Sequence, residues 1–289
     1  MIGKIIGLAG WGIGPTSTET EGKAITQAPH IRSVRVFVGA GLPVSMPAAQ
    51  GNPCRIVMLK AAADAAPPPS GVTQCCTWLS VDGVPHVRCW TPEGRPINLC
   101  GHGLLSCGTA WAERGYSVSR MIMNHANVRF SLQQDISWIG FDPITIESSV
   151  VPDWVEKVFG SVPQSAAVAG SEAGYLILCW PASMDLRGLR VPGPDLAEYT
   201  GRAIIATCAD DQSSALDIRH RYFAPQHGIA EDIATGSAMR VLACFWQVQA
   251  GYDALRAWQC SAEGGHLFSR TEDGVIWVGG RVEAETDRV

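Results

Sequence analysis

The chain has 289 residues, of which 46% are hydrophobic and 17% are charged, and its formal net charge is -5. A chain of this length forms one large or two moderate domains and can bury a core without metal or disulfide support. The negative charge argues against a surface that binds nucleic acid or an anionic membrane. No apolar run approaches the roughly 18 residues of a membrane-spanning helix.

Residues 1–30 lack the periodicity of a helix or a strand. We interpret them as an N-terminal extension outside the fold. The weakly apolar stretch from Ile5 to Gly14 contains glycines and has no small-residue cleavage site, which does not fit a signal peptide. We therefore expect a cytoplasmic protein.

The next part of the chain has the pattern of several strands followed by a helix. Strands are predicted at 33–38 and 55–59, and a hairpin around Asp82-Gly83 joins 76–81 to 84–90. A short strand at 96–99 then runs through Gly101-His102-Gly103 into an apolar stretch, 104–111, that is long enough for a buried helix.

The second half has the same order of elements. Strands are predicted at 144–148, 173–179, 203–208 and 218–223, with hairpin-like strands near 258–259 and 267–278. Thr235-Gly236-Ser237-Ala238 leads into an apolar helix that reaches Trp246. Antiparallel-looking strands with one buried helix in each half predict an α+β fold. Neither glycine turn fits a dinucleotide-binding motif and no phosphate-binding loop occurs, so no nucleotide cofactor is expected.

The chain contains ten cysteines. No two of them have Cys-x-x-Cys spacing and no histidine follows at the spacing of a zinc finger, so we predict no metal site. In a reducing cytoplasm we expect free thiols, most of them small buried hydrophobic side chains.

Four short segments together resemble one superfamily. They are Gly51-Asn52-Pro53; Leu99-Cys100-Gly101-His102-Gly103; Arg221-Tyr222-Phe223-Ala224-Pro225 with Gly228-Ile229-Ala230-Glu231-Asp232 before Thr235-Gly236-Ser237-Ala238; and Gln259-Cys260-Ser261 before Gly264-Gly265. In combination they resemble the phenazine-biosynthesis isomerase family (PhzF-like), which is related to diaminopimelate epimerase and proline racemase. The resemblance covers roughly Ile31 to Glu285.

This resemblance implies two similar lobes, each an antiparallel β-barrel around a central helix, with the active site in the cleft between them. The N-terminal lobe would comprise residues 31–120, completed by the last strand at about 276–286, and the C-terminal lobe residues 121–275. Family members move a proton between carbons of a small carboxylic acid without a cofactor. The resemblance also implies a homodimer and a role in natural-product biosynthesis.

The two predicted helix N-termini are candidate binding sites for the substrate carboxylate. Their unpaired backbone N–H groups and positive dipole ends favour an anion, and Gly101, Gly103 and Gly236 let the backbone approach it closely. Ser237 either hydrogen-bonds the carboxylate or only fills a small helix position. Asn52 of the first family motif is the remaining candidate for substrate binding.

Three residues of the motifs are candidate acids or bases. Asp232 matches the aspartate that faces the substrate in the family, although a helix-capping acid is the simpler structural reading. His102 either shuttles a proton or is satisfied by the backbone at its turn. Cys100 corresponds to an acid/base thiol of the racemases and epimerases, whereas PhzF-like sequences often carry this cysteine without needing it. The second racemase cysteine is absent, since Ile233 or Ala234 takes its place.

The catalytic glutamate of the family is also absent. In our register Cys75 stands at its position, either as a replacement base or as an inert small residue. Three functions therefore remain open: a cofactor-independent isomerase or epimerase, a cyclase or dehydratase on the same scaffold, and a non-catalytic protein that binds a small acid.

Overall fold

The computed structural model describes residues 30–39, 47–62, 70–212 and 214–285. The predicted N-terminal extension therefore lies outside the described residues, apart from His30. None of the helices in the described ranges is long and apolar enough to cross a membrane.

The part of the chain up to residue 141 forms strands and one long helix. In order these are β1 (His30–Val36), β2 (Asn52–Met58), β3 (Thr73–Leu79), β4 (Pro85–Trp90), β5 (Pro96–Ile97), α1 (Gly101–Glu113), β6 (Arg120–Met123), β7 (Ala126–Gln133) and β8 (Ile136–Phe141). Burial alternates along β2, because every second side chain points toward the core that contains α1. α1 packs against β2, β3, β4 and β8.

The rest of the chain forms a second set of strands with its own long helix. In order these are β9 (Ile146–Ser149), α2 (Val155–Phe159), β10 (Ser165–Ala169), β11 (Tyr175–Cys179), η1 (Leu186–Gly188), α3 (Leu196–Tyr199), β12 (Ala203–Ala209), β13 (Ile218–Phe223), η2 (Pro225–His227), α4 (Gly236–Ala250), β14 (Ala254–Gln259), β15 (Gly265–Glu272), β16 (Val275–Gly280) and β17 (Val282–Ala284). α4 packs against β9, β14, β15 and β16.

Hydrogen bonds connect all of these strands into one continuous sheet. Around α1 the pairing runs from β1 through β2, β3, β4, β6, β7 and β8 to β16, and β17 pairs with β1. Around α4 it runs from β9 through β10, β11, β12, β13, β14 and β15 to β16. β16 thus belongs to both sets, and it joins them.

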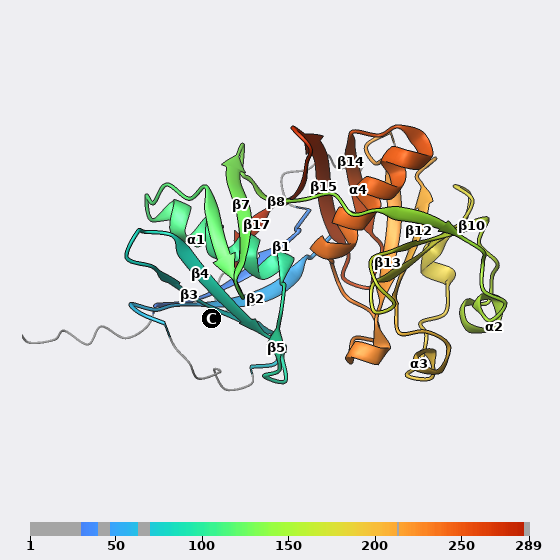
Figure 1. The fold of residues 1–289 in the computed structure, drawn as a ribbon, viewed down its shortest axis with the longest axis horizontal. Helices are drawn as coiled ribbons and strands as arrows, with labels where there is room; N and C mark the ends of the chain where they lie inside the picture. The colour runs from blue at the N-terminus through green and yellow to red at the C-terminus, as the bar shows by residue number, and fades with distance from the viewer. Residues whose placement is uncertain (1–29, 40–46, 63–69, 213, 286–289) are drawn as a thin grey trace, which may run out of the picture.

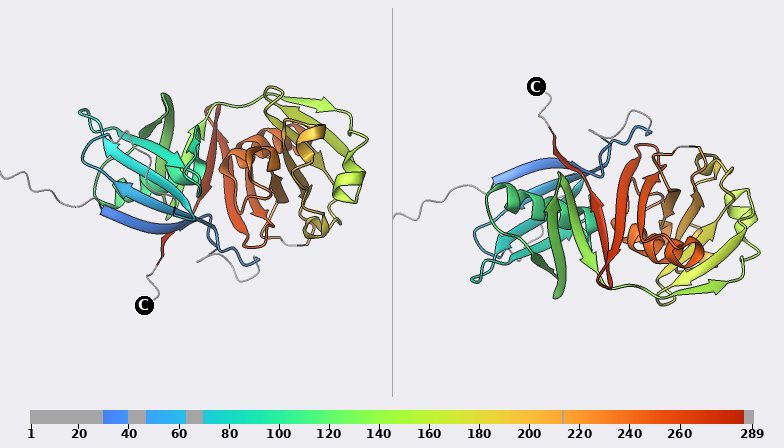
Figure 2. Two further views of the ribbon diagram at one scale, coloured as in Figure 1. Left: turned by 90° about the horizontal axis from the view of Figure 1, so that it is seen from below. Right: turned by 90° about the horizontal axis from the view of Figure 1, so that it is seen from above.

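Figure 1 shows the two sets of strands side by side, one with α1 and one with α4. In both views of Figure 2 the red strands near the C-terminus lie between them. We call the two sets the α1 half and the α4 half. The architecture is mixed α+β with mostly sheet and few helices, which confirms the predicted α+β class. The expectation of purely antiparallel strands is wrong, because β2 pairs with β3, β4 with β6, β11 with β12 and β13 with β14 in parallel.

Two differences from the predicted elements concern strands β6, β7 and β8. The sequence pattern did not predict any of the three, although they follow directly on α1. β7 and β8 contact α1, so residues 126–141 lie in the α1 half. A lobe boundary at residue 120 stays a prediction, and these contacts favour a boundary after Phe141.

A disulfide joins Cys75 of β3 to Cys89 of β4. The two residues are direct partners in the antiparallel register, and their Cα atoms lie 4.2 Å apart. Facing positions of this kind bring two side chains close enough to bond. The expectation of free thiols is therefore wrong for this pair, whereas the other eight cysteines, all of them in the described ranges, are free.

Candidate active site

The two long helices begin in contact with each other. α1 starts at Gly101 and α4 at Gly236, and a Cβ atom on Gly101 would lie 3.3 Å from the Cα atom of Gly236. The residues before them, Cys100 and Thr235, have almost the same extended backbone, with φ and ψ of -124° and 100° and of -121° and 100°. Glycine at both starts is what allows the backbones to approach this closely.

Neither helix start is capped by a side chain among the described residues. Neither first turn contains an acidic residue. Several backbone N–H groups at each helix start have no partner within the helix. Two positive dipole ends therefore meet at one place, which is an arrangement suited to a carboxylate.

A cavity of about 640 Å³ lies at this meeting point. Its wall includes seven of the nine residues that the sequence selected, namely Asn52, Cys100, Gly101, His102, Asp232, Gly236 and Ser237. Residues from both the α1 half and the α4 half contribute to the wall. The structure thus brings these seven residues together, and it places Gly103 and Cys75 behind the wall.

Asp232 is held in place by two side chains. Its Oδ1 accepts a hydrogen bond from Asn52 Nδ2 at 3.0 Å, and its Oδ2 accepts one from Thr235 Oγ1 at 2.6 Å. Burial raises the pKa of Asp232 above its ordinary value, although the hydrogen bonds from Thr235 and Asn52 oppose this rise. A carboxylate with a raised pKa accepts and returns a proton more readily near neutral pH.

A buried glutamine fixes the segment that carries Asp232. Gln259 has no exposed surface, and its Oε1 accepts the backbone N–H of Thr235 at 2.8 Å. Its Nε2 donates to the backbone oxygen of Asp232 at 2.7 Å. His220 Nε2 lies 2.9 Å from the same Oε1, and since that oxygen only accepts, His220 is the donor. From the sequence, Gln259 was recognised only as part of a motif, and His220 was not selected.

We expect His220 to make stability depend on pH. Burial lowers its pKa from an ordinary 6.5 to about 4, and its Nδ1 has no partner among the described residues. The neutral ring therefore stabilises the fold fully above pH 6.5, and this contribution is lost as the pH falls toward 4. The loss amounts to about 3 kcal/mol. Measured by urea unfolding, the free energy of unfolding should fall less between pH 7 and pH 4.5 for His220→Gln than for the wild type.

The matched control for this experiment is His125→Asn, because His125 is exposed. The free energy of unfolding of this variant should fall between pH 7 and pH 4.5 by as much as that of the wild type. If His220→Gln keeps it as well, His220 is not the group that titrates.

His102 and Cys100 contact each other at the start of α1. Both ring nitrogens of His102 lie 3.7 Å from Cys100 Sγ. Burial alone would lower the pKa of His102, but the charge of Cys100 and its hydrogen bond outweigh this, so the pKa lies above its ordinary value. The pair can therefore hold a proton at the N-terminus of α1, on the wall of the cavity.

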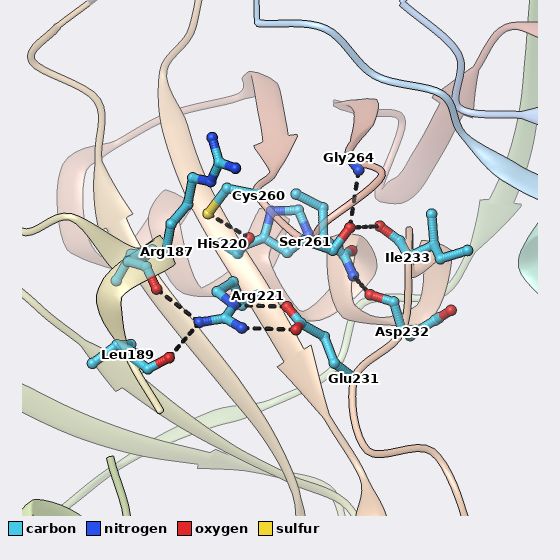
Figure 3. A network of polar contacts seen from close by, with 12 residues as sticks. Arg187, Leu189, His220, Arg221, Glu231, Asp232, Ile233, Cys260, Ser261 and Gly264 are labelled. Atoms are coloured by element: carbon cyan, nitrogen blue, oxygen red, sulfur yellow. Dashed lines mark hydrogen bonds and ion pairs between the residues drawn. The ribbon is translucent and has the colours of Figure 1, made fainter. Parts of the chain in front are cut away.

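A buried ion pair supports the wall next to Asp232. Arg221 donates from Nε and Nη2 to the two carboxylate oxygens of Glu231, at 2.6 and 2.7 Å. Its Nη1 donates to the backbone oxygens of Leu186 and Leu189, at 3.0 and 2.7 Å. Figure 3 shows Arg221 between Leu189 and Glu231, with Asp232 following Glu231 along the chain. Both residues belong to a family motif, but the sequence did not indicate a role for either.

Three further residues of the cavity wall were not among the site residues selected from the sequence. They are Arg95, Tyr175 and Tyr222. A Cβ atom on Gly228 would lie 2.7 Å from Arg95 Nη2, so the guanidinium of the α1 half reaches the loop before Asp232. Since no motif surrounds Arg95 in the sequence, only the fold reveals this position.

The structure does not place Cys75 as a base toward the cavity. It is fully buried, its sulfur is bonded to Cys89, and a disulfide sulfur carries no proton to exchange. Thr73, two residues earlier on β3, lines the cavity instead. In this state the position of the missing glutamate therefore offers no acid or base.

Because Gly103 has no side chain, it leaves space for the sulfur atoms of Cys75 and Cys89. A Cβ atom there would lie 2.4 Å from Cys75 Sγ and 2.5 Å from Cys89 Sγ. Although alanine ordinarily stabilises a helix by about 1 kcal/mol relative to glycine, overpacking of a core costs about 1–3 kcal/mol. We expect Gly103→Ala to lower the free energy of unfolding, measured with urea. Gly188→Ala is the control, because its new Cβ would approach only Asp185 Oδ2, at 4.0 Å; equal values for both variants would contradict the packing argument.

Comparison with known proteins found similar sequences and structures. The family model described as "Phenazine biosynthesis-like protein" matches residues 161–289. An uncharacterised isomerase of Vibrio cholerae is 33% identical over 208 residues, which cover 68% of this chain and 69% of the relative.

Solved structures share the fold. A phenazine biosynthesis protein of the PhzF family from Enterococcus faecalis aligns with a TM-score of 0.71 at 21% identity, and the alignment covers 89% of this chain and 96% of that one. A probable proline racemase from Agrobacterium radiobacter aligns with a TM-score of 0.55 at 10% identity, over 91% and 93% of the two chains.

Proposed function

Because the chain belongs to the phenazine biosynthesis-like (PhzF) family of isomerases, we propose that it is a cofactor-independent isomerase or epimerase that moves a proton on a small carboxylic or amino acid. We place the substrate in natural-product metabolism, as the family name suggests. We also propose that each half is a β-barrel closed around its helix, and that the cavity is the cleft between two lobes.

One observation carries this proposal: two uncapped helix N-termini meet at the wall of a cavity that also contains Asp232. A carboxylate bound to the N–H groups of both helices would present its α-carbon to the side chains around it. When that carbon loses a proton, negative charge moves onto the carboxylate oxygens. Preorganised N–H donors stabilise this charge as it develops.

The proton transfer needs one group that takes the proton and one that returns it. We assign the first role to Asp232, whose raised pKa and fixed orientation suit an acid/base group. His102 with Cys100 supplies the second group. Ser237 at the start of α4 contributes a hydroxyl and a backbone N–H to the carboxylate, while Asn52 orients Asp232.

Deuterium wash-in tests this function. The purified protein is incubated in D2O, without added cofactor, with a panel of small amino acids and cyclic carboxylic acids, and the acids are analysed by mass spectrometry. An isomerase incorporates deuterium from solvent into its substrate. A dehydratase instead yields a product that has lost water. A binding protein leaves every acid unchanged, and its melting temperature rises when one of the acids binds. The relatives do not favour these two alternatives, since several of them are named as isomerases.

A further inference from the structure

Three cysteine sulfurs lie together beneath the start of α1. The Sγ atoms of Cys75, Cys89 and Cys100 are all within 4.8 Å of one another. Cys75 and Cys89 are joined by the disulfide, and Cys100 is a free thiol. The backbone of Gly103 packs directly on all three, since a Cβ atom there would be 3.1 Å or less from each sulfur. A free thiol is therefore in position next to a disulfide.

Cys100 differs from the other two sulfurs in its access and its surroundings. Of these three described residues it alone lines the cavity. It is the residue directly before the first turn of α1, and both ring nitrogens of His102, which can accept its proton, lie 3.7 Å from its Sγ. The thiolate is the species that attacks a disulfide.

Cys54 provides an internal comparison. Its Sγ lies 3.7 Å from Cys75 Sγ and donates to it, so it is as close to the disulfide as an attacking thiol needs to be. However, it does not line the cavity, and burial raises its pKa to about 12. Cys54 therefore remains a protonated thiol, and proximity alone does not make it reactive.

We propose that Cys75, Cys89 and Cys100 form a redox-active site in which Cys100 exchanges with the disulfide and connects it to small thiols in the cavity. The Cys100 thiolate attacks the sulfur of Cys75 or Cys89. A new S–S bond to Cys100 forms as the bond between Cys75 and Cys89 breaks, and the displaced sulfur leaves as a thiolate that takes up the proton lost by Cys100. This internal step involves no net oxidation.

A small thiol such as glutathione completes the reaction through the cavity. It attacks the disulfide that now includes Cys100, and a second glutathione resolves the mixed disulfide. Two glutathione molecules become one glutathione disulfide, while the protein disulfide gains two electrons and two protons. The buried disulfide is thus reduced through a residue at the wall, and this does not depend on the proposed isomerisation.

The first test measures how fast glutathione reduces the Cys75–Cys89 disulfide in the full-length chain. Samples are quenched with acid, alkylated, and cleaved after Arg88 and after Glu93, which places the three cysteines on separate peptides. We expect Cys100→Ser to slow the reduction at least about ten-fold, because the attacking thiolate is lost. Cys54→Ser is the matched control and should reduce at the wild-type rate.

The second test asks which disulfides form when one partner is removed. Cys75→Ser, equilibrated with glutathione and glutathione disulfide, should form a bond between Cys89 and Cys100. Cys89→Ser should form one between Cys75 and Cys100. Recovery of Cys100 in its alkylated form from both variants would overturn the proposal, provided that their circular dichroism matches the wild type.

Reduction of Cys100→Ser at the wild-type rate would overturn the proposal without relying on those variants. If, in addition, the reduced wild-type chain retained zinc that Cys100→Ser lost, the same cluster would be a metal site instead.

Discussion

Replacement of Asp232 by asparagine is expected to lower the rate of deuterium incorporation by about 10²–10⁴-fold, the contribution typical of one acid/base group. Asparagine cannot take up a proton, yet it fits the same contacts. Its Oδ1 can accept from Asn52 Nδ2, and its Nδ2 can donate to Thr235 Oγ1, which now accepts. The variant should therefore fold normally, as judged by circular dichroism, while its exchange rate is measured by mass spectrometry.

The matched control is Asp142→Asn. Asp142 has a side chain that is 85% exposed and does not line the cavity. Its replacement should leave the exchange rate unchanged. Asp232→Asn with the wild-type rate on a genuine substrate would remove Asp232 from the mechanism.

Replacement of Glu231 by glutamine is expected to lower the free energy of unfolding by about 3–5 kcal/mol, because it leaves the guanidinium of Arg221 buried without a counter-charge. The side chains of Arg221 and Glu231 are only 6% and 16% exposed, and the Nη1 bonds to Leu186 and Leu189 keep the guanidinium inside. Urea unfolding at neutral pH measures the loss.

An exposed ion pair of this chain provides the comparison. Arg256 donates from Nη2 to Asp217 Oδ1 at 2.9 Å, and 45% of the arginine and 20% of the aspartate side chain are exposed, so its guanidinium is far more exposed than that of Arg221. Water screens such a pair, so Arg256→Gln should cost about 0–1 kcal/mol. Equal losses for Glu231→Gln and Arg256→Gln would show that burial of the Arg221 pair has no special effect.

The sequence was most informative where function depends on a few neighbouring residues. Gly101 and Gly236 each precede an apolar run, so both helix starts could be placed from local pattern alone, and the structure brings them into contact. Asp232 and Ser237 lie on either side of the second start and were selected as part of the family motif, and both line the cavity. Asn52 was selected by its motif, although its bond to Asp232 links residues 180 positions apart.

The sequence was less informative where the site depends on strand register. The bonds from Gln259 to Thr235 and Asp232, and its contact with His220, arise because β13 and β14 pair side by side, with His220 opposite Gln259. A single chain does not reveal which strands of a large sheet become neighbours. Arg95 reaches the cavity from a turn of the other half, far from Asp232 in the sequence.

The disulfide is a different case. The hairpin around Asp82-Gly83 was predicted, and its register places Cys75 opposite Cys89. The expectation of a reducing environment led instead to free thiols. Geometry within one hairpin was therefore the stronger guide to this pair than the inferred compartment.

A crystal structure with a bound substrate or small carboxylate tests the central claim most directly, because the claim concerns where a carboxylate binds. We expect its oxygens within hydrogen-bond distance of backbone N–H groups in the first turns of both α1 and α4, between Gly101 and Gly236, with the α-carbon facing Asp232. A carboxylate that instead pairs with Arg95, with only water at the two helix starts, would contradict the account.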